Sequence, residues 1–218
     1  MSNESDELSL YHVSRPGSVD SNAPAVVVIH GRGADERDLL PIADRLPEEI
    51  HVLSVRAPNA MGPGYTWYDL DLSGGGLHAS QPDAEDFRES LDLLHAFVEE
   101  ATEAYDLDPE RIGLLGFSQG AITSLSALLE RPEAYRWVVA LHGYLADSHE
   151  GQAAAADGKP VFVGCGTADE VIPARRAERA AETLENGGAA VRFERYRTGH
   201  GTTPAEVEDL VAWIEDRY

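Results

Sequence analysis

One stretch of the chain decides its fold: Ile112-Gly113-Leu114-Leu115-Gly116-Phe117-Ser118-Gln119-Gly120-Ala121. Its apolar beginning predicts a buried strand, and the run that continues to Leu129 predicts a helix. The turn between them reads G-x-S-x-G, a pattern that holds a serine in a sharp strand-to-helix bend. Glycine is needed on both sides because a larger side chain would collide with the neighbouring strand and helix. Ser118 is therefore the candidate nucleophile, and the alternative is a serine that caps the helix.

Outward from this turn, apolar β-branched runs alternate with amphipathic stretches. The runs are short and almost free of charge, as expected of strands that are buried on both faces. The predicted strands are Ala25–His30, Val52–Val55, Ile112–Phe117, Trp137–Leu141, Val161–Cys165 and Val191–Tyr196. The predicted helices are Asp83–Tyr105, Gln119–Leu129, Pro173–Leu184 and Pro204–Arg217. This alternation predicts an α/β fold, with a mostly parallel central sheet and helices on both of its faces.

Three further segments complete the outline. Leu8–Val13 is a possible edge strand, whereas Arg56–Pro82 and Gly143–Lys159 look irregular. Irregular loops of that length are usually functional or mobile. The second of them is short, which leaves little room for a cap domain. At 218 residues the chain fits one domain spanning residues 1–218.

A serine hydroxyl is a poor nucleophile without a base, and eight histidines compete for that role. His200 follows the last predicted strand in Arg197-Thr198-Gly199-His200-Gly201, where flanking glycines allow the loop to approach another loop. His30 and His142 also end strands, but one precedes the serine and the other follows it too soon. His200 is the preferred base, and a plain surface-loop histidine is the alternative.

The base needs a carboxylate that accepts a hydrogen bond from its second ring nitrogen. Asp169 follows the predicted strand Val161–Cys165, which gives the chain order Ser…Asp…His that α/β-hydrolases use. Glu170, next to it, and Asp147, after the preceding strand, are the competing positions. In a chain this acidic, any one of the three can also be a solvated surface group.

Acyl transfer also needs backbone N–H groups that stabilise the oxygen on which negative charge develops. The residue after the nucleophile, Gln119, supplies one of them in this kind of turn. The loop after an early strand should supply the second, and His30-Gly31-Arg32-Gly33 occupies that place. A plain glycine turn is the alternative reading of that loop.

These motifs together resemble the phospholipase/carboxylesterase family of α/β-hydrolases, which includes acyl-protein thioesterases and bacterial carboxylesterases. The resembling stretches are Val28-Ile29-His30-Gly31-Arg32-Gly33-Ala34-Asp35, Arg56-Ala57-Pro58, Trp67-Tyr68-Asp69, Gly116-Phe117-Ser118-Gln119-Gly120, Gly166-Thr167-Ala168-Asp169 with Val171-Ile172-Pro173, and Gly199-His200. The resemblance implies an α/β-hydrolase fold without a large cap domain and the hydrolysis of small carboxylic esters or thioesters, with no metal or organic cofactor. It also implies that Arg32 and Gln119 supply the two oxyanion N–H groups.

The chain departs from the family in two places. Arg32 stands where the thioesterases commonly have an apolar residue, and the loop Met61–Ser80 matches no substrate-binding loop. Trp67 and Tyr65 can line an acyl pocket there or anchor the loop in the core. The predicted mechanism is that of a serine hydrolase, in which Ser118 is acylated and then deacylated by water. A peptide- or lactone-hydrolysing enzyme, and a non-catalytic binding module on the same fold, are the alternatives.

The charge and composition of the chain argue against some classes of binding partner. The chain has 17 basic and 39 acidic residues, a net charge of −22, which repels nucleic acid and anionic membranes. Such a charge is either a well-solvated surface or an adaptation to high salt, and we favour the halophilic interpretation. No apolar run reaches the ~18 residues of a membrane span, and no signal peptide is visible. With Cys165 as the single cysteine, the sequence predicts a cytoplasmic protein.

Overall fold

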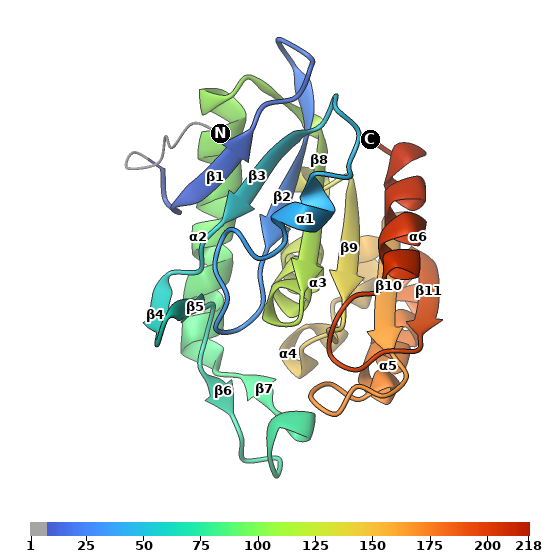
Figure 1. Ribbon diagram of the computed structural model, residues 1–218. Helices are drawn as coiled ribbons and strands as arrows, with labels where there is room; N and C mark the ends of the chain where they lie inside the picture. The colour runs from blue at the N-terminus through green and yellow to red at the C-terminus, as the bar shows by residue number, and fades with distance from the viewer. Residues whose placement is uncertain (1–7) are drawn as a thin grey trace.

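The computed structural model describes residues 8–218, which form a seven-stranded sheet in the order β1-β3-β2-β8-β9-β10-β11 (Figure 1). Its strands are β1 (His12–Arg15), β2 (Ala23–Ile29), β3 (His51–Val55), β8 (Leu107–Phe117), β9 (Trp137–Leu141), β10 (Pro160–Gly166) and β11 (Ala190–Tyr196). β1 pairs antiparallel with β3, and every other pair in this sheet is parallel. The predicted mostly parallel sheet is confirmed.

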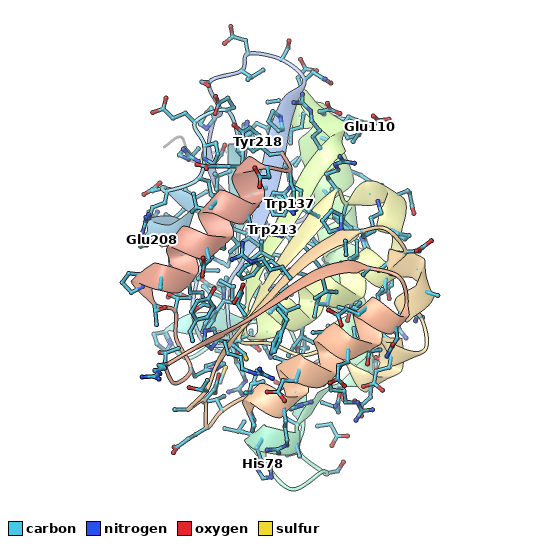
Figure 2. The ribbon with its side chains drawn as sticks, turned by 90° about the vertical axis from the view of Figure 1, so that its right-hand side faces the viewer. His78, Glu110, Trp137, Glu208, Trp213 and Tyr218 are labelled. Atoms are coloured by element: carbon cyan, nitrogen blue, oxygen red, sulfur yellow. The ribbon has the colours of Figure 1, made fainter. Side chains whose placement is uncertain are left out.

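Helices cover both faces of the sheet. α2 (Ala84–Ala104), α3 (Gln119–Glu130) and α5 (Ala174–Asn186) lie on one face, and α1 (Leu40–Ala43) and α6 (Pro204–Glu215) lie on the other. The interior strand β2 contributes to both layers, because Val27 packs into the first core and Val26 into the second. Beneath α6, Trp213 meets Trp137 edge-on with ring centroids 6.1 Å apart (Figure 2).

The edge strand begins four residues later than predicted and ends two residues later. The prediction was Leu8–Val13, but strand pairing begins at His12 and ends at Arg15. Leu10 is buried because its side chain packs into the core, while Ser9 is tied to α2 by hydrogen bonds to Glu100. The apolar character of this segment therefore reflects packing rather than strand pairing.

The two segments predicted to be irregular contain short regular elements. Residues 56–82 form two small hairpins, β4 (Asn59–Met61) with β5 (Gly64–Thr66) and β6 (Leu70–Asp71) with β7 (Gln81–Pro82), together with the 3-10 turn η1 (Leu77–Ala79). The first turns at Gly62, whose φ of +58° suits glycine. Residues 143–159 contain α4 (Asp147–Glu150) and η3 (Ala153–Ala156), while a further 3-10 turn, η2 (Pro132–Ala134), precedes β9. Across residues 8–218, no insertion is large enough to form a cap domain.

The parallel strands bring several loops to one edge. The arrowheads of β8, β9 and β10 in Figure 1 point towards the end of the molecule where the β6–β7 hairpin lies. Chain order reverses between the neighbours β2 and β8, and ligands of open α/β sheets bind outside the strand ends at such a point. No helix within residues 8–218 is both long and apolar enough to cross a membrane.

Candidate active site

Ser118 occupies a strained bend between β8 and α3. Its φ of +54° lies in the left-handed region, which is uncommon for residues other than glycine. A Cβ on Gly116 would lie 2.2 Å from the carbonyl oxygen of Gly120, and one on Gly120 would lie 1.9 Å from that of Ile29. Both glycines are thus required by close packing. Within the described chain, the Ser118 side chain makes no capping hydrogen bond to α3, so the capping alternative does not account for it.

Three side chains that are distant in sequence meet in series at this bend. The Nε2 atom of His200 lies 3.0 Å from the Oγ atom of Ser118, and its Nδ1 atom lies 2.7 Å from the Oδ2 atom of Asp169. Backbone bonds hold the two supporting loops together, since the N–H of Ala168 donates to the carbonyl of Thr198 over 3.0 Å. The arrangement is that of a nucleophile, its base and an orienting carboxylate.

The environment of Asp169 keeps its carboxylate ionised. Burial alone would raise its pKa, but the hydrogen bonds from His200 and from backbone N–H groups outweigh burial and lower it. The N–H groups of Val171 and Ile172 both donate to its Oδ1 atom, each over 2.9 Å. One oxygen thus fixes the carboxylate to its loop, and the other faces the histidine.

Neither competing carboxylate takes this place. Glu170 is exposed to solvent, whereas Asp169 is 7% exposed. Asp147 begins α4 and lines a different hollow of the molecule. Asp169 is the acid that the fold brings to His200.

Arg32 and Gln119, the predicted oxyanion donors, both line the pocket that contains Ser118. Gln119 is the first residue of α3, and its side chain fixes the loop that crosses the site. Its amide oxygen accepts from Thr66 Oγ1 and from the N–H of Trp67, over 3.0 and 3.1 Å, and its amide nitrogen donates to the carbonyl of Tyr68. The residue after Ser118 therefore also positions one wall of the site.

Trp67 and Tyr65 lie outside this pocket. Trp67 is fully buried, and its ring N–H donates to the carbonyl of His30 over 2.9 Å. Tyr65 is half-buried, with the Arg56 guanidinium 4.5 Å from its ring centroid. Among the described residues, the lining of the Ser118 pocket includes neither aromatic side chain. Their contacts fit the loop-anchoring alternative rather than an acyl-pocket wall.

The pocket beside Ser118 has a volume of about 200 Å³. Its lining is largely apolar, with a few polar groups near the serine. The lining residues are Arg32, Leu70, Leu77, Ser80, Ser118, Gln119, Ile122, Tyr144, Val171, Ile172 and His200. The sequence interpretation missed its apolar wall from the β6–β7 hairpin; isolated leucines in a glycine-rich loop were the available signal.

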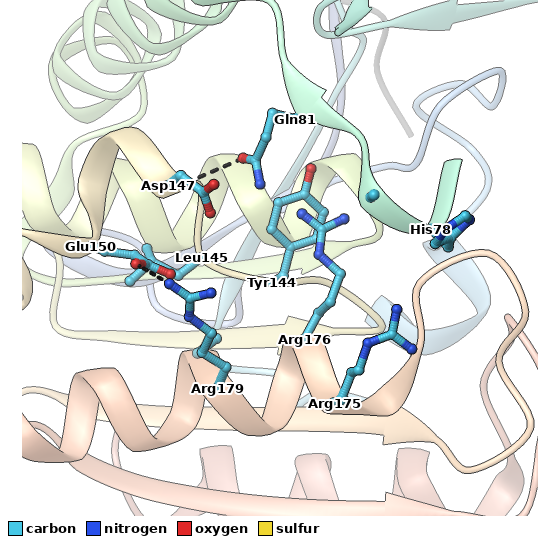
Figure 3. A pocket seen from close by; sticks show the side chains of 11 residues that line it. His78, Gln81, Tyr144, Leu145, Asp147, Glu150, Arg175, Arg176 and Arg179 are labelled. Atoms are coloured by element: carbon cyan, nitrogen blue, oxygen red, sulfur yellow. Dashed lines mark hydrogen bonds and ion pairs between the residues drawn. The ribbon is translucent and has the colours of Figure 1, made fainter. Parts of the chain in front are cut away.

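A second hollow of about 300 Å³ lies next to it and shares Tyr144 (Figure 3). Its walls carry charges of both signs, and two of its arginines are already engaged. Arg179 pairs with Glu150 over 2.7 Å, and Arg176 lies over the Tyr144 ring and donates to the carbonyl of Ser80. Among the described residues, the lining of this hollow does not include Ser118, whereas the lining of the apolar pocket does. The apolar pocket is therefore the candidate active site.

The structure adds two residues that the sequence interpretation did not select. The Nδ1 atom of His142 lies 3.3 Å from Asp169 Oδ2, and its Nε2 atom lies 3.2 Å from Glu206 Oε2. His142, Asp169 and His200 can also hold a metal ion, because one ligand atom from each lies within 4.8 Å of the others. In this arrangement those atoms face hydrogen-bond partners instead. The signal that could have found His142 is its position directly after β9, at the carboxyl edge of the sheet.

A strained serine at the carboxyl edge of a parallel sheet, with a histidine and a carboxylate in series behind it, defines the class of α/β-hydrolases. Residues 16–217 match the model of the phospholipase/carboxylesterase family. The chain belongs to this family, as its motifs predicted, and it is an enzyme of the serine hydrolase type.

Relatives and solved structures agree with this assignment. The putative hydrolase MhqD of Bacillus subtilis is 25% identical over 94% of this chain and 98% of its own. Acyl-protein thioesterase 1 of Eremothecium gossypii is 29% identical over 88% and 86%. The crystal structure of esterase PE8 has a TM-score of 0.84 and 27% identity, covering 96% of this chain and 99% of its own. The Bacillus cereus carboxylesterase has a TM-score of 0.82 and 28% identity, covering 96% and 95%.

Proposed function

We propose that the protein hydrolyses carboxylic esters or thioesters through an acyl-enzyme formed on Ser118. The observation that carries this proposal is the series of contacts from Ser118 through His200 to Asp169, at 3.0 and 2.7 Å. The family and the named relatives, thioesterases and carboxylesterases among them, support ester or thioester hydrolysis.

In the proposed mechanism, His200 removes the proton of the Ser118 hydroxyl as its oxygen attacks the substrate carbonyl. The backbone N–H groups of Arg32 and Gln119 stabilise the oxyanion of the tetrahedral intermediate. His200 then gives the proton to the departing alcohol or thiol, which leaves the acyl group on the serine. A water molecule, deprotonated by the same histidine, attacks the acyl-enzyme ester. His200 then returns that proton to Ser118 Oγ as the bond to the acyl group breaks, which releases the acid and restores the free hydroxyl.

The proposed substrate is a small molecule with a short or medium acyl or alcohol group. The pocket's volume of about 200 Å³ limits the group that can be enclosed, and its apolar walls favour hydrocarbon. Arg32 brings a positive charge to the same pocket, and the resemblance to the family implies that this position is commonly apolar in the thioesterases. We therefore expect this enzyme to accept substrates with polar or anionic groups near the carbonyl better than those relatives do.

A labelling experiment and a substrate panel test the proposed function. A fluorophosphonate probe should form one adduct per chain, located on Ser118 by peptide mass spectrometry. p-Nitrophenyl esters and matched thioesters of two to twelve acyl carbons should be hydrolysed, with kcat/KM declining for the longest chains. Absence of both the adduct and turnover would instead support a non-catalytic binding module. Turnover confined to peptides or lactones would support the alternative enzyme.

We also propose that the protein works in the cytoplasm of a cell with high internal salt. The net charge of −22 causes self-repulsion that counterions screen, so the free energy of unfolding should rise with KCl concentration. A gain of about 2 kcal/mol corresponds to roughly 4–8 °C in melting temperature for a chain of this length. Melting curves between 0.05 and 3 M KCl measure this directly, and greatest stability without salt would refute the adaptation.

A further inference from the structure

A buried histidine lies directly behind the catalytic carboxylate. His142 follows β9 with a φ of +53°, a conformation uncommon for a residue other than glycine. Its backbone N–H donates to the carbonyl of Gly164 in β10 over 2.8 Å. Its side chain has no exposed surface. Strained backbone of this kind persists where the surroundings enforce it, often at functional sites.

Both ring nitrogens of this histidine face carboxylates. Nδ1 lies 3.3 Å from Asp169 Oδ2, the oxygen that also accepts from His200, and Nε2 lies 3.2 Å from Glu206 Oε2. Phe117 packs beside both imidazoles, with its ring centroid 5.3 Å from that of His142 and 5.1 Å from that of His200. The contacts therefore run without a break from Ser118 to Glu206.

Glu206 is buried in α6, with its carboxylate against Gly164 of β10. It stands in the first turn of α6, where its backbone N–H donates to Thr203 Oγ1 over 3.2 Å. A Cβ on Gly164 would lie 2.4 Å from its Oε1 atom, an atom that has no hydrogen-bond partner among residues 8–218. A carboxylate in a first turn gains from the helix dipole without being buried. Full burial of this one costs free energy unless a partner such as His142 compensates it.

The contact with Asp169 shows that Nδ1 of His142 carries a proton. An ionised carboxylate only accepts hydrogen bonds, so the contact with Asp169 requires a proton on Nδ1 of His142. Burial alone would lower the pKa of His142, but the bonds to Glu206 and Asp169 outweigh it and raise the pKa. On the neighbouring strands, burial raises the pKa of Cys165 to about 11 and raises that of Tyr196, so both groups stay neutral near pH 7.

We propose that His142 and Glu206 are positioning residues of the catalytic triad, an inference that rests on the proposed function. His142 donates its Nδ1 proton to the second lone pair of Asp169 Oδ2, and Glu206 holds the imidazole in the required orientation. This second donor fixes the carboxylate and makes it a weaker base. His200 is then protonated less readily and stays available as a base at lower pH.

Two substitutions at position 142 separate this role from simple packing. In His142→Asn the amide nitrogen stands near the place of Nδ1 and keeps the donor to Asp169, and asparagine tolerates a positive φ. In His142→Gln the amide reaches towards Glu206 and the donor to Asp169 is lost. We expect His142→Gln to lower kcat about tenfold, a typical loss when a hydrogen-bond partner that orients a functional group is replaced. KM should change less than twofold. The acid-side midpoint of its kcat/KM profile should rise by about half a pH unit or more.

His142→Asn should retain the wild-type midpoint and at least a third of kcat. His149→Gln is the matched control, because His149 is another buried histidine that pairs with a glutamate. Its Nε2 atom lies 3.1 Å from Glu130 Oε1, and neither residue lines the Ser118 pocket described above. It should leave the pH profile unchanged. Equal midpoints in His142→Gln and His142→Asn, whether shifted or not, would overturn the positioning role.

A measurement on the wild-type protein does not depend on the variants folding. In a sample labelled with ¹⁵N-histidine, the Nδ1 atom of His142 should carry a proton throughout pH 6–8. An unprotonated Nδ1 in that range would overturn the inference. The proposed function fails separately, by absence of wild-type turnover and labelling, so the two failures cannot be confused.

Discussion

Ser118→Ala is expected to lower kcat by about 10⁵–10⁶-fold, which is the scale seen when a serine nucleophile is removed from a triad. The substitution removes the only oxygen that lies 3.0 Å from His200 Nε2 in the described chain, so no covalent intermediate can form. Residual turnover would come from the oxyanion donors and from substrate binding, which together exceed the uncatalysed rate by ~10³–10⁴. Initial rates with a p-nitrophenyl ester, at enzyme concentrations high enough to detect slow turnover, measure the loss.

The same variant should fold normally. Ser118 is 8% exposed and its side chain caps no described helix, so its loss leaves the packing of α3 in place. Ser126→Ala is the matched control, since Ser126 is a buried serine in the same helix. It should keep wild-type kcat, and both variants should melt within about 2 °C of the wild type. Retention of more than a few per cent of kcat in Ser118→Ala would show that another group is the nucleophile.

The sheet could be predicted because each of its buried strands can be recognised from its own residues. Strands buried on both faces appear as uninterrupted apolar runs, and Trp137–Leu141 was predicted with the bounds of β9. The catalytic candidates could be predicted for a related reason. Parallel strands bring the residues after their carboxyl ends to one edge, so Asp169 and His200 were expected to lie close together, and they lie 2.7 Å apart.

The rest depends on contacts that no local pattern encodes. The β4–β5 hairpin is fixed by distant parts of the chain, through the bridge between Ala34 and Tyr65 and through the Gln119 side chain. The pairing of His142 with Glu206 joins positions 64 residues apart in the sequence, from a strand end and a helix start. The position of His142 in the chain excluded it as the base of Ser118. The structure places it beside Asp169 instead, a contact that the sequence did not predict.

Gly120→Ala is expected to destabilise the protein, although the same change usually stabilises a helix. Alanine in a helix interior is favoured over glycine by about 1 kcal/mol. At this position the new Cβ would lie 1.9 Å from the carbonyl oxygen of Ile29 and 2.9 Å from that of His30. Both are backbone atoms at the end of β2, so no side-chain rotation relieves the collision. Helix α3 must move away from the sheet.

That movement also displaces Ser118 from His200, the proposed catalytic base, because Ser118 directly precedes α3. We expect a loss of about 3 kcal/mol or more in the free energy of unfolding, a drop of roughly 6–12 °C in melting temperature. A displacement of 1 Å at the nucleophile is enough to lower kcat about 100-fold. Gly151→Ala is the control, since a Cβ there meets no described atom within 4 Å and its φ of −67° suits any residue. Wild-type melting and kcat in Gly120→Ala would mean that α3 does not press on β2, and the steric basis of the serine bend would be wrong.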